Sequence, residues 1–165
     1  MPGLIYSHAS GLVLIEEEVV DSLDRWRQNG SQAEAGGILI GYRRPPHLHV
    51  ITCTTPFAKD RRSRFEFLRR DPQHALIARQ YWHETDGQAY YLGDWHTHPV
   101  AIPSPSAVDH KEWKKLIKSR LGPRLLFVIV GKSQWHAQLG TRKMKILSCG
   151  SDTDGVQSKN DIPVF

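Results

Sequence analysis

Two histidines and an aspartate stand at a spacing that suits a metal ion. His96 and His98 come directly after residues 89–95, a segment that is rich in apolar and aromatic residues and is predicted as a strand. Side chains two residues apart in a strand point to the same face, so both imidazoles can reach one ion. Ser106 and Asp109 follow a proline-containing loop, and on a helix starting there they face the same way. Imidazole and carboxylate ligands suit zinc, which in catalytic sites takes three protein ligands and leaves a fourth place for water.

Each half of this pattern has a simpler explanation. Ser-x-x-Asp is close to a helix capping box, with Ser106 as the cap and Asp109 reaching back. The His-x-His spacing also occurs at His47 and His49, where no carboxylate follows at helix spacing and a plain strand face is expected. Both features together, joined by a short loop, favour a Zn²⁺ site with His96, His98 and Asp109 as ligands.

A water molecule activated by zinc needs a proton acceptor that is not itself a ligand. Glu34 is the candidate, because it precedes an apolar segment, residues 36–41, that is predicted as a buried strand beside the one ending at His98. Partial desolvation there would raise its pKa toward a useful range. Spacing alone does not choose it over the chemically equivalent glutamates Glu16, Glu17, Glu18, Glu66, Glu84 and Glu112.

The elements that must position these groups alternate between strands and helices. Apolar runs and turn residues predict strands at 10–15, 36–41, 47–55, 64–68, 89–95 and 125–130. Helices are predicted from Glu16 to Asn29, from Asp71 to Thr85 and over 106–121, a charged loop over 59–64, and a closing antiparallel pair at 135–139 and 143–147. We expect an α/β fold with a mixed sheet flanked by helices, a domain over residues 1–148, and a flexible tail over 149–165.

Composition narrows the class further. The 165 residues are 39% apolar and 24% charged, and no apolar run approaches the length of a membrane span, so a disordered polymer and a membrane protein are excluded. No signal peptide is recognised, and two distant cysteines, Cys53 and Cys149, fit a reducing cytoplasm. The net charge of +5 and the pI of about 9.4 favour an acidic partner without establishing nucleic-acid binding.

The order of the motifs resembles one family. The pattern is Glu34 ahead of Gly36-Gly37, then His96-Thr97-His98-Pro99, then Ser106-Ala107-Val108-Asp109, with seven residues between His98 and Ser106. It is similar to the pattern of the JAMM (MPN+) metallopeptidases. Every position of that pattern is filled. The resemblance implies a JAB1/MPN domain with a cytidine-deaminase-like fold, although the deaminase signature itself is absent. It also implies roles: His96, His98 and Asp109 bind zinc, Glu34 moves the proton, and Ser106 donates to the oxyanion.

The family resemblance further implies a hydrolase that cuts after the C-terminus of a ubiquitin-like protein or of a C-terminal extension. The compact size is similar to prokaryotic members, among them the JAMM peptidase of CBASS anti-phage operons, which removes a nucleotidyltransferase (CD-NTase) from protein conjugates. We therefore expect a protein substrate with an extended tail, and neither a membrane nor a nucleic acid as partner. Two alternatives remain: a basic scaffold or nucleic-acid-binding module, carried by the arginines near residues 61–70, and a small-molecule amidase on the same zinc site.

Overall fold

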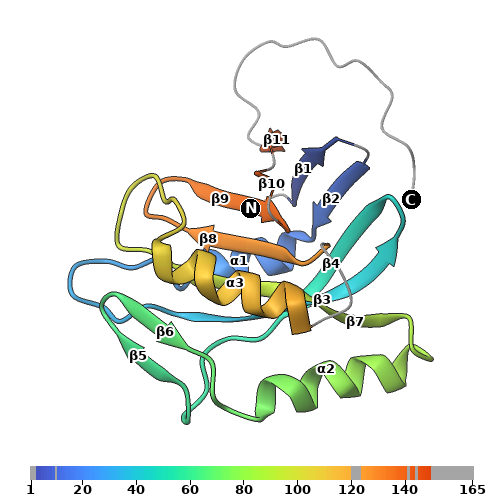
Figure 1. The fold of residues 1–165 in the computed structure, drawn as a ribbon, viewed down its shortest axis with the longest axis horizontal. Helices are drawn as coiled ribbons and strands as arrows, with labels where there is room; N and C mark the ends of the chain where they lie inside the picture. The colour runs from blue at the N-terminus through green and yellow to red at the C-terminus, as the bar shows by residue number, and fades with distance from the viewer. Residues whose placement is uncertain (1–2, 10, 120–123, 141, 144, 150–165) are drawn as a thin grey trace.

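One mixed sheet dominates the computed structural model, which describes residues 3–9, 11–119, 124–140, 142–143 and 145–149. Its strand order is β10-β9-β8-β7-β3-β4-β2-β1-β11 (Figure 1). The pairs β2–β4 and β7–β8 are parallel and the other neighbours are antiparallel, which confirms the predicted mixed α/β fold. The strands are β1 (Leu4–His8), β2 (Gly11–Ile15), β3 (Gly36–Arg44), β4 (His47–Cys53), β7 (Ala89–Thr97), β8 (Leu126–Val130), β9 (Trp135–Leu139), β10 (Arg142–Lys143) and β11 (Lys145–Cys149).

The strands that carry the candidate site lie in the middle of this sheet. β3 runs antiparallel to β7, with Gly36 opposite His96 and Gly37 opposite Trp95. β7 in turn runs parallel to β8. The prediction that the strand after Glu34 lies beside the strand leading to the histidines is therefore confirmed.

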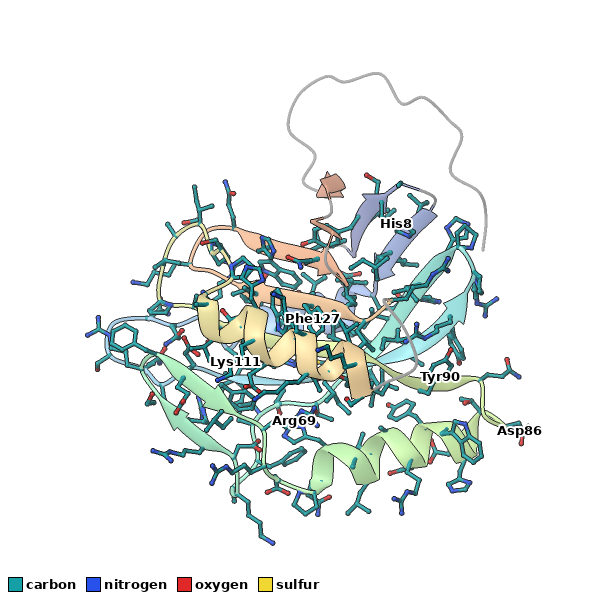
Figure 2. All side chains as sticks on the ribbon, in the orientation of Figure 1. His8, Arg69, Asp86, Tyr90, Lys111 and Phe127 are labelled. Atoms are coloured by element: carbon teal, nitrogen blue, oxygen red, sulfur yellow. The ribbon has the colours of Figure 1, made fainter. Side chains whose placement is uncertain are left out.

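Two apolar clusters form the core, one on each face of the sheet. Leu126 and Val128 of β8 join helix α1 (Glu17–Asp24) in the larger cluster. Phe127 and Ile129 point the other way and join Trp113 of helix α3 (Ala107–Ser119), whose ring stacks on Phe127 with centroids 4.5 Å apart. Figure 2 shows Phe127 next to α3. Because successive residues of a strand face opposite sides, α1 and α3 cover opposite faces of the sheet, as Figure 1 shows.

The remaining elements stand beside the sheet. Helix α2 (Gln73–Glu84) packs next to β7 and β3 and buries only His74 among its residues. Strands β5 (Arg61–Ser63) and β6 (Glu66–Leu68) pair with each other and form a separate hairpin (Figure 1).

Several predicted boundaries were wrong. Helix α1 ends at Asp24 rather than near Asn29, and the predicted charged loop over 59–64 contains strand β5, because strand pairing uses backbone groups whatever the side chains carry. The segment 143–147 does not simply close against β9: β10 does so, whereas β11 pairs with β1. Cys149 belongs to β11, and the rest of the predicted tail, residues 150–165, lies outside the described residues.

Within the described part of the chain, every helix is too short or too polar to cross a membrane.

Candidate metal centre and active site

The two histidines point to one face of the sheet, as their spacing predicts. Their Nε2 atoms lie 3.0 Å apart. His98 stands one residue past the end of β7, where its backbone N–H donates to the carbonyl of Val130 over 3.0 Å and continues the ladder with β8. Thr97, between them, faces the other way: its hydroxyl accepts the N–H of Ala35 and donates to the side chain of Gln28. Strand geometry thus aims both imidazoles at one place.

Asp109 reaches the same place from the first turn of α3. Its Oδ1 lies 3.2 Å from Nε2 of His96 and its Oδ2 lies 3.4 Å from Nε2 of His98. The Ser106 N–H donates to Asp109 Oδ2 over 2.6 Å, and the Asp109 N–H donates to Ser106 Oγ over 3.1 Å. This is the reciprocal pattern of a capping box. Ser-x-x-Asp therefore forms a capping box, and its aspartate also faces the two histidines.

The donor set fits a divalent metal ion. One ligand atom from each of His96, His98 and Asp109 lies within 4.8 Å of the other two. Ligand atoms about 2.0–2.1 Å from a tetrahedral ion lie about 3.3 Å from one another, close to the three separations found here. Two imidazole nitrogens that face each other need a shared proton or cation between them. A metal ion satisfies both nitrogens at once.

The electrostatics of these groups favour a cation. Burial alone would raise the pKa of Asp109, but hydrogen bonds from His96 and His98 outweigh it and hold that pKa well below its usual range. Burial would lower the pKa of His98, but the hydrogen bond and charge of Asp109, together with the charge of Glu34, raise it. Both pKa shifts arise because the carboxylates stabilise positive charge nearby, and a bound metal ion would supply such a charge.

Glu34 lies in the same groove and is 4% exposed. Desolvation raises the pKa of its carboxyl to about 7; the charges of Asp109 and Glu66 act in the same direction and that of His98 opposes them. A carboxyl with a pKa near neutrality can both accept and return a proton. Of the glutamates that the sequence left as rivals, Glu66 and Glu112 also line the groove, whereas Glu16 bonds to His49 on another part of the sheet.

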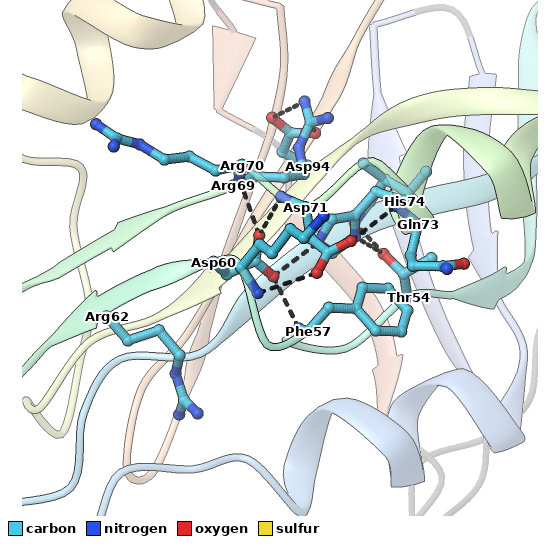
Figure 3. A network of polar contacts seen from close by, with 12 residues as sticks. Thr54, Phe57, Asp60, Arg62, Arg69, Arg70, Asp71, Gln73, His74 and Asp94 are labelled. Atoms are coloured by element: carbon cyan, nitrogen blue, oxygen red, sulfur yellow. Dashed lines mark hydrogen bonds and ion pairs between the residues drawn. The ribbon is translucent and has the colours of Figure 1, made fainter.

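The groove has a volume of about 690 Å³ and runs between hairpin β5–β6 and helix α3. Phe65 at the tip of the hairpin is 71% exposed and Val108 on α3 is 60% exposed, so both banks present apolar side chains to solvent. Arg69 lines the same groove and faces Asp94, with nitrogen and oxygen 3.4 Å apart (Figure 3). The candidate metal ligands and Glu34 thus lie in a channel with apolar banks.

A buried polar network beside the site was not predicted from the sequence (Figure 3). The carboxylate of Asp60 accepts the backbone N–H groups of Phe57, Arg70 and Asp71 and bonds to Nε2 of His74. Through these bonds Asp60 joins the two ends of hairpin β5–β6 to helix α2.

The network continues to the site strands. Nδ1 of His74 bonds to the hydroxyl of Thr54, which accepts the N–H of Ile38 in β3. The carbonyl of Thr54 accepts the indole N–H of Trp95, the residue before His96. Trp95 is 1% exposed and belongs to the core, and it also lines the groove.

The sequence offered little signal for these residues. Asp60 stands in a run of charged residues that resembles a solvated loop, and His74 lies on a helix with a mostly exposed surface. One signal could have marked His74 as buried. His74 lies three residues after Asp71, in the first turn of the helix, which faces the sheet.

The sequence pattern of the family described as "Prokaryotic homologs of the JAB domain" matches residues 16–145. The chain belongs to this family and is a JAMM-type hydrolase, and the family implies a metal cofactor, which the His96, His98 and Asp109 triad fits.

Individual relatives agree. A "CD-NTase/cGAS isopeptidase" of Pseudomonas aeruginosa is 37% identical over 123 residues, which cover 72% of this chain and 78% of the relative. A protein of the same name from Vibrio cholerae is 35% identical over 138 residues, covering 83% and 86%. A "probable metalloprotease" of Sinorhizobium fredii is 30% identical over 139 residues, covering 78% and 84%.

One solved structure has a similar fold. The solution structure of protein DSY2949 from Desulfitobacterium hafniense superposes with a TM-score of 0.56 at 20% identity, covering 80% of this chain and 87% of that one. This likeness concerns the fold alone.

Proposed function

We propose that this chain is a zinc isopeptidase that releases a CD-NTase from protein conjugates by cutting after its C-terminal tail. The observation that carries the proposal is the convergence of His96, His98 and Asp109 within 4.8 Å, with buried Glu34 in the same groove. The names of the relatives from Pseudomonas and Vibrio support the substrate class. Imidazole and carboxylate donors suit zinc, and the proposal commits to that metal.

The mechanism assigns one task to each side chain. His96, His98 and Asp109 would hold the ion, which when bound supplies a Lewis acid and lowers the pKa of water. Glu34 accepts a proton from the attacking water and returns it to the leaving lysine amine, a task that its pKa of about 7 suits. Ser106 accepts the Asp109 N–H at its oxygen, which leaves its own hydrogen to donate to the oxyanion of the tetrahedral intermediate.

The groove fits an extended tail better than a small amide. Glu66, Phe67 and Leu68 of β6 line it, and among the described strands β6 pairs with β5 alone. An added strand can therefore pair with the open edge of β6. A Cβ atom built on Gly36 would lie 2.4 Å from the ring of Phe67, so the hairpin already rests against β3 and limits the width of the channel. Small residues at the cleavage point fit that width.

Two of the arginines near the hairpin argue against the nucleic-acid alternative. Arg62 donates to the carbonyls of Ala33 and Glu34, and Arg69 faces Asp94. These guanidinium groups are engaged within the molecule rather than arranged as a free basic surface.

The test is cleavage of a defined conjugate. A CD-NTase joined through its C-terminal carboxyl to a lysine side chain should be cut by the purified full chain. Chelation should stop the reaction and added zinc should restore it. Glu34→Gln should keep the metal, measured by elemental analysis, and lose cleavage. Activity that survives both chelation and Glu34→Gln would reject the proposal.

A further inference from the structure

We infer that Arg62 is a positioning residue for Glu34, acting through the backbone of residues 33–34 rather than through contact with the substrate. The inference rests on the proposed function, because it takes Glu34 to be the group that moves the proton. Hairpin β5–β6 would then have two roles: it positions the proposed general base and forms one side of the groove.

Hydrogen bonds tie both backbone groups of Glu34 to β5. The Nε of Arg62 donates to the carbonyl of Glu34 over 2.6 Å, and its Nη2 donates to the carbonyl of Ala33 over 3.2 Å. The N–H of Glu34 donates to the carbonyl of Ser63 over 2.7 Å. Glu34 precedes strand β3, which begins at Gly36, so these bonds fix a residue that the sheet ladder does not reach.

The guanidinium group is itself held in place. It lies over the ring of Trp26, 5.1 Å from the centroid, and Trp26 packs against the main core cluster. A planar guanidinium can stack on an aromatic ring while two of its N–H groups point at neighbouring acceptors. Lysine has a single ammonium group on a flexible stem, so it cannot reproduce this geometry. Bonds from a charged donor are also stronger than those between neutral groups.

Gln28 is 1% exposed and takes part in the same network of hydrogen bonds. Its Nε2 donates to the carbonyl of Arg64 in the turn of the hairpin and to the carbonyl of Gln32 ahead of Glu34. Its Oε1 accepts the hydroxyl of Thr97, the residue between the two histidines. Hydrogen bonds therefore join the hairpin, the segment that carries Glu34 and the strand that carries the imidazoles, and Arg62 is an exposed residue of this network.

Loss of Arg62 should act on the chemical step. A displacement of a reacting group by about 1 Å costs on the order of 10²-fold in rate. Arg62→Ala should therefore lower kcat about 10- to 100-fold, whereas KM for the conjugate and the zinc content stay near their wild-type values. Arg62→Lys, which keeps the charge without the fork, should restore only part of kcat.

The matched control is Arg61→Ala. Arg61 is the exposed neighbour of Arg62 on the same strand, and its side chain faces the opposite way. The change removes the same charge next to the same hairpin. It should leave kcat within about twofold of the wild type.

A second measurement does not depend on catalysis. Hydrogen–deuterium exchange of the metal-free protein should be faster over residues 33–36 in Arg62→Ala than in the wild type or in Arg61→Ala, because the bond from the Glu34 N–H to Ser63 loosens.

The outcomes separate the inference from the function on which it rests. An active wild type with unchanged kcat and unchanged exchange in Arg62→Ala overturns the inference alone. A rise in KM, or a fall in zinc content or melting temperature, that accounts for the lost rate also overturns the inference, because Arg62 would then have a general structural role. A wild type without chelator-sensitive cleavage overturns the proposed function and the inference with it.

Discussion

Replacing Asp60 by alanine should lower the free energy of unfolding by about 3–5 kcal/mol. The side chains of Asp60 and His74 are both fully buried, with 0% exposure. The variant leaves the His74 ring and the N–H groups of Phe57, Arg70 and Asp71 without their acceptor. Each buried donor left unpaired costs about 1–3 kcal/mol, and breaking a buried ionisable pair costs about 3–5 kcal/mol. The expected loss is smaller than the sum of these costs because the segment can rearrange in part around the missing carboxylate.

Thermal unfolding followed by fluorescence or circular dichroism measures this effect. A chain of this size shifts its midpoint by roughly 2–4 °C per kcal/mol, so a fall of about 10 °C is expected. Glu84→Ala is the control: Glu84 is exposed on α2, its carboxylate accepts only a neighbouring amide hydrogen bond from Gln80, and its loss should change stability by about 0.5 kcal/mol or less. A loss below about 1 kcal/mol in Asp60→Ala would refute the reasoning.

The same carboxylate gives this stability a pH dependence. Burial alone would raise the pKa of Asp60, but the hydrogen bonds from Phe57, Asp71, His74 and Arg70 outweigh it and lower that pKa. A group with a lower pKa in the folded state stabilises the fold above its unfolded pKa of about 4 and loses that contribution as the pH falls through the folded value. The stability gap between wild type and Asp60→Asn should therefore narrow below about pH 4, measured by urea unfolding.

Three further outcomes are expected. Alanine at any one of the proposed metal ligands, His96, His98 or Asp109, should abolish zinc binding and cleavage together, as elemental analysis and a conjugate assay would show. Ser106→Ala should lower kcat by about 10²-fold through the lost oxyanion donor and lower stability by about 1 kcal/mol through the lost helix cap, read from kinetics and melting of the same preparation. Gly37→Ala should fail to accumulate as folded protein in an expression trial, since its Cβ would lie 2.1 Å from the backbone oxygen of Thr54.

Some parts of the site could be predicted because they follow from local geometry. The shared direction of His96 and His98 needs only the alternation of a strand, and the position of Asp109 needs only the first turn of a helix. The candidate general base could not be predicted from local spacing. Six other glutamates have the same chemistry, and only the family resemblance favoured Glu34. Its burial and its pKa near 7 come from β3 pairing with β7, which local spacing does not determine.

The supporting residues could not be predicted for a different physical reason. Arg62 and Gln28 bond to backbone carbonyls, and every residue offers a carbonyl, so no side-chain pattern marks the partner. Strand β5 of the hairpin was missed because all three of its residues are charged or polar, with no alternation to count. Contacts of this kind depend on the three-dimensional path of the chain.

The capping box at the start of α3 bears on how lost activity would be recognised among relatives. Ser106 and Asp109 begin the helix through two bonds that need no metal. A descendant that gave up hydrolysis would still be under selection to keep both residues, since the helix would fray without them. Ser-x-x-Asp is therefore a poor marker of a working enzyme, and decay should first become visible at His96, His98 and Glu34, whose side chains do not begin a helix.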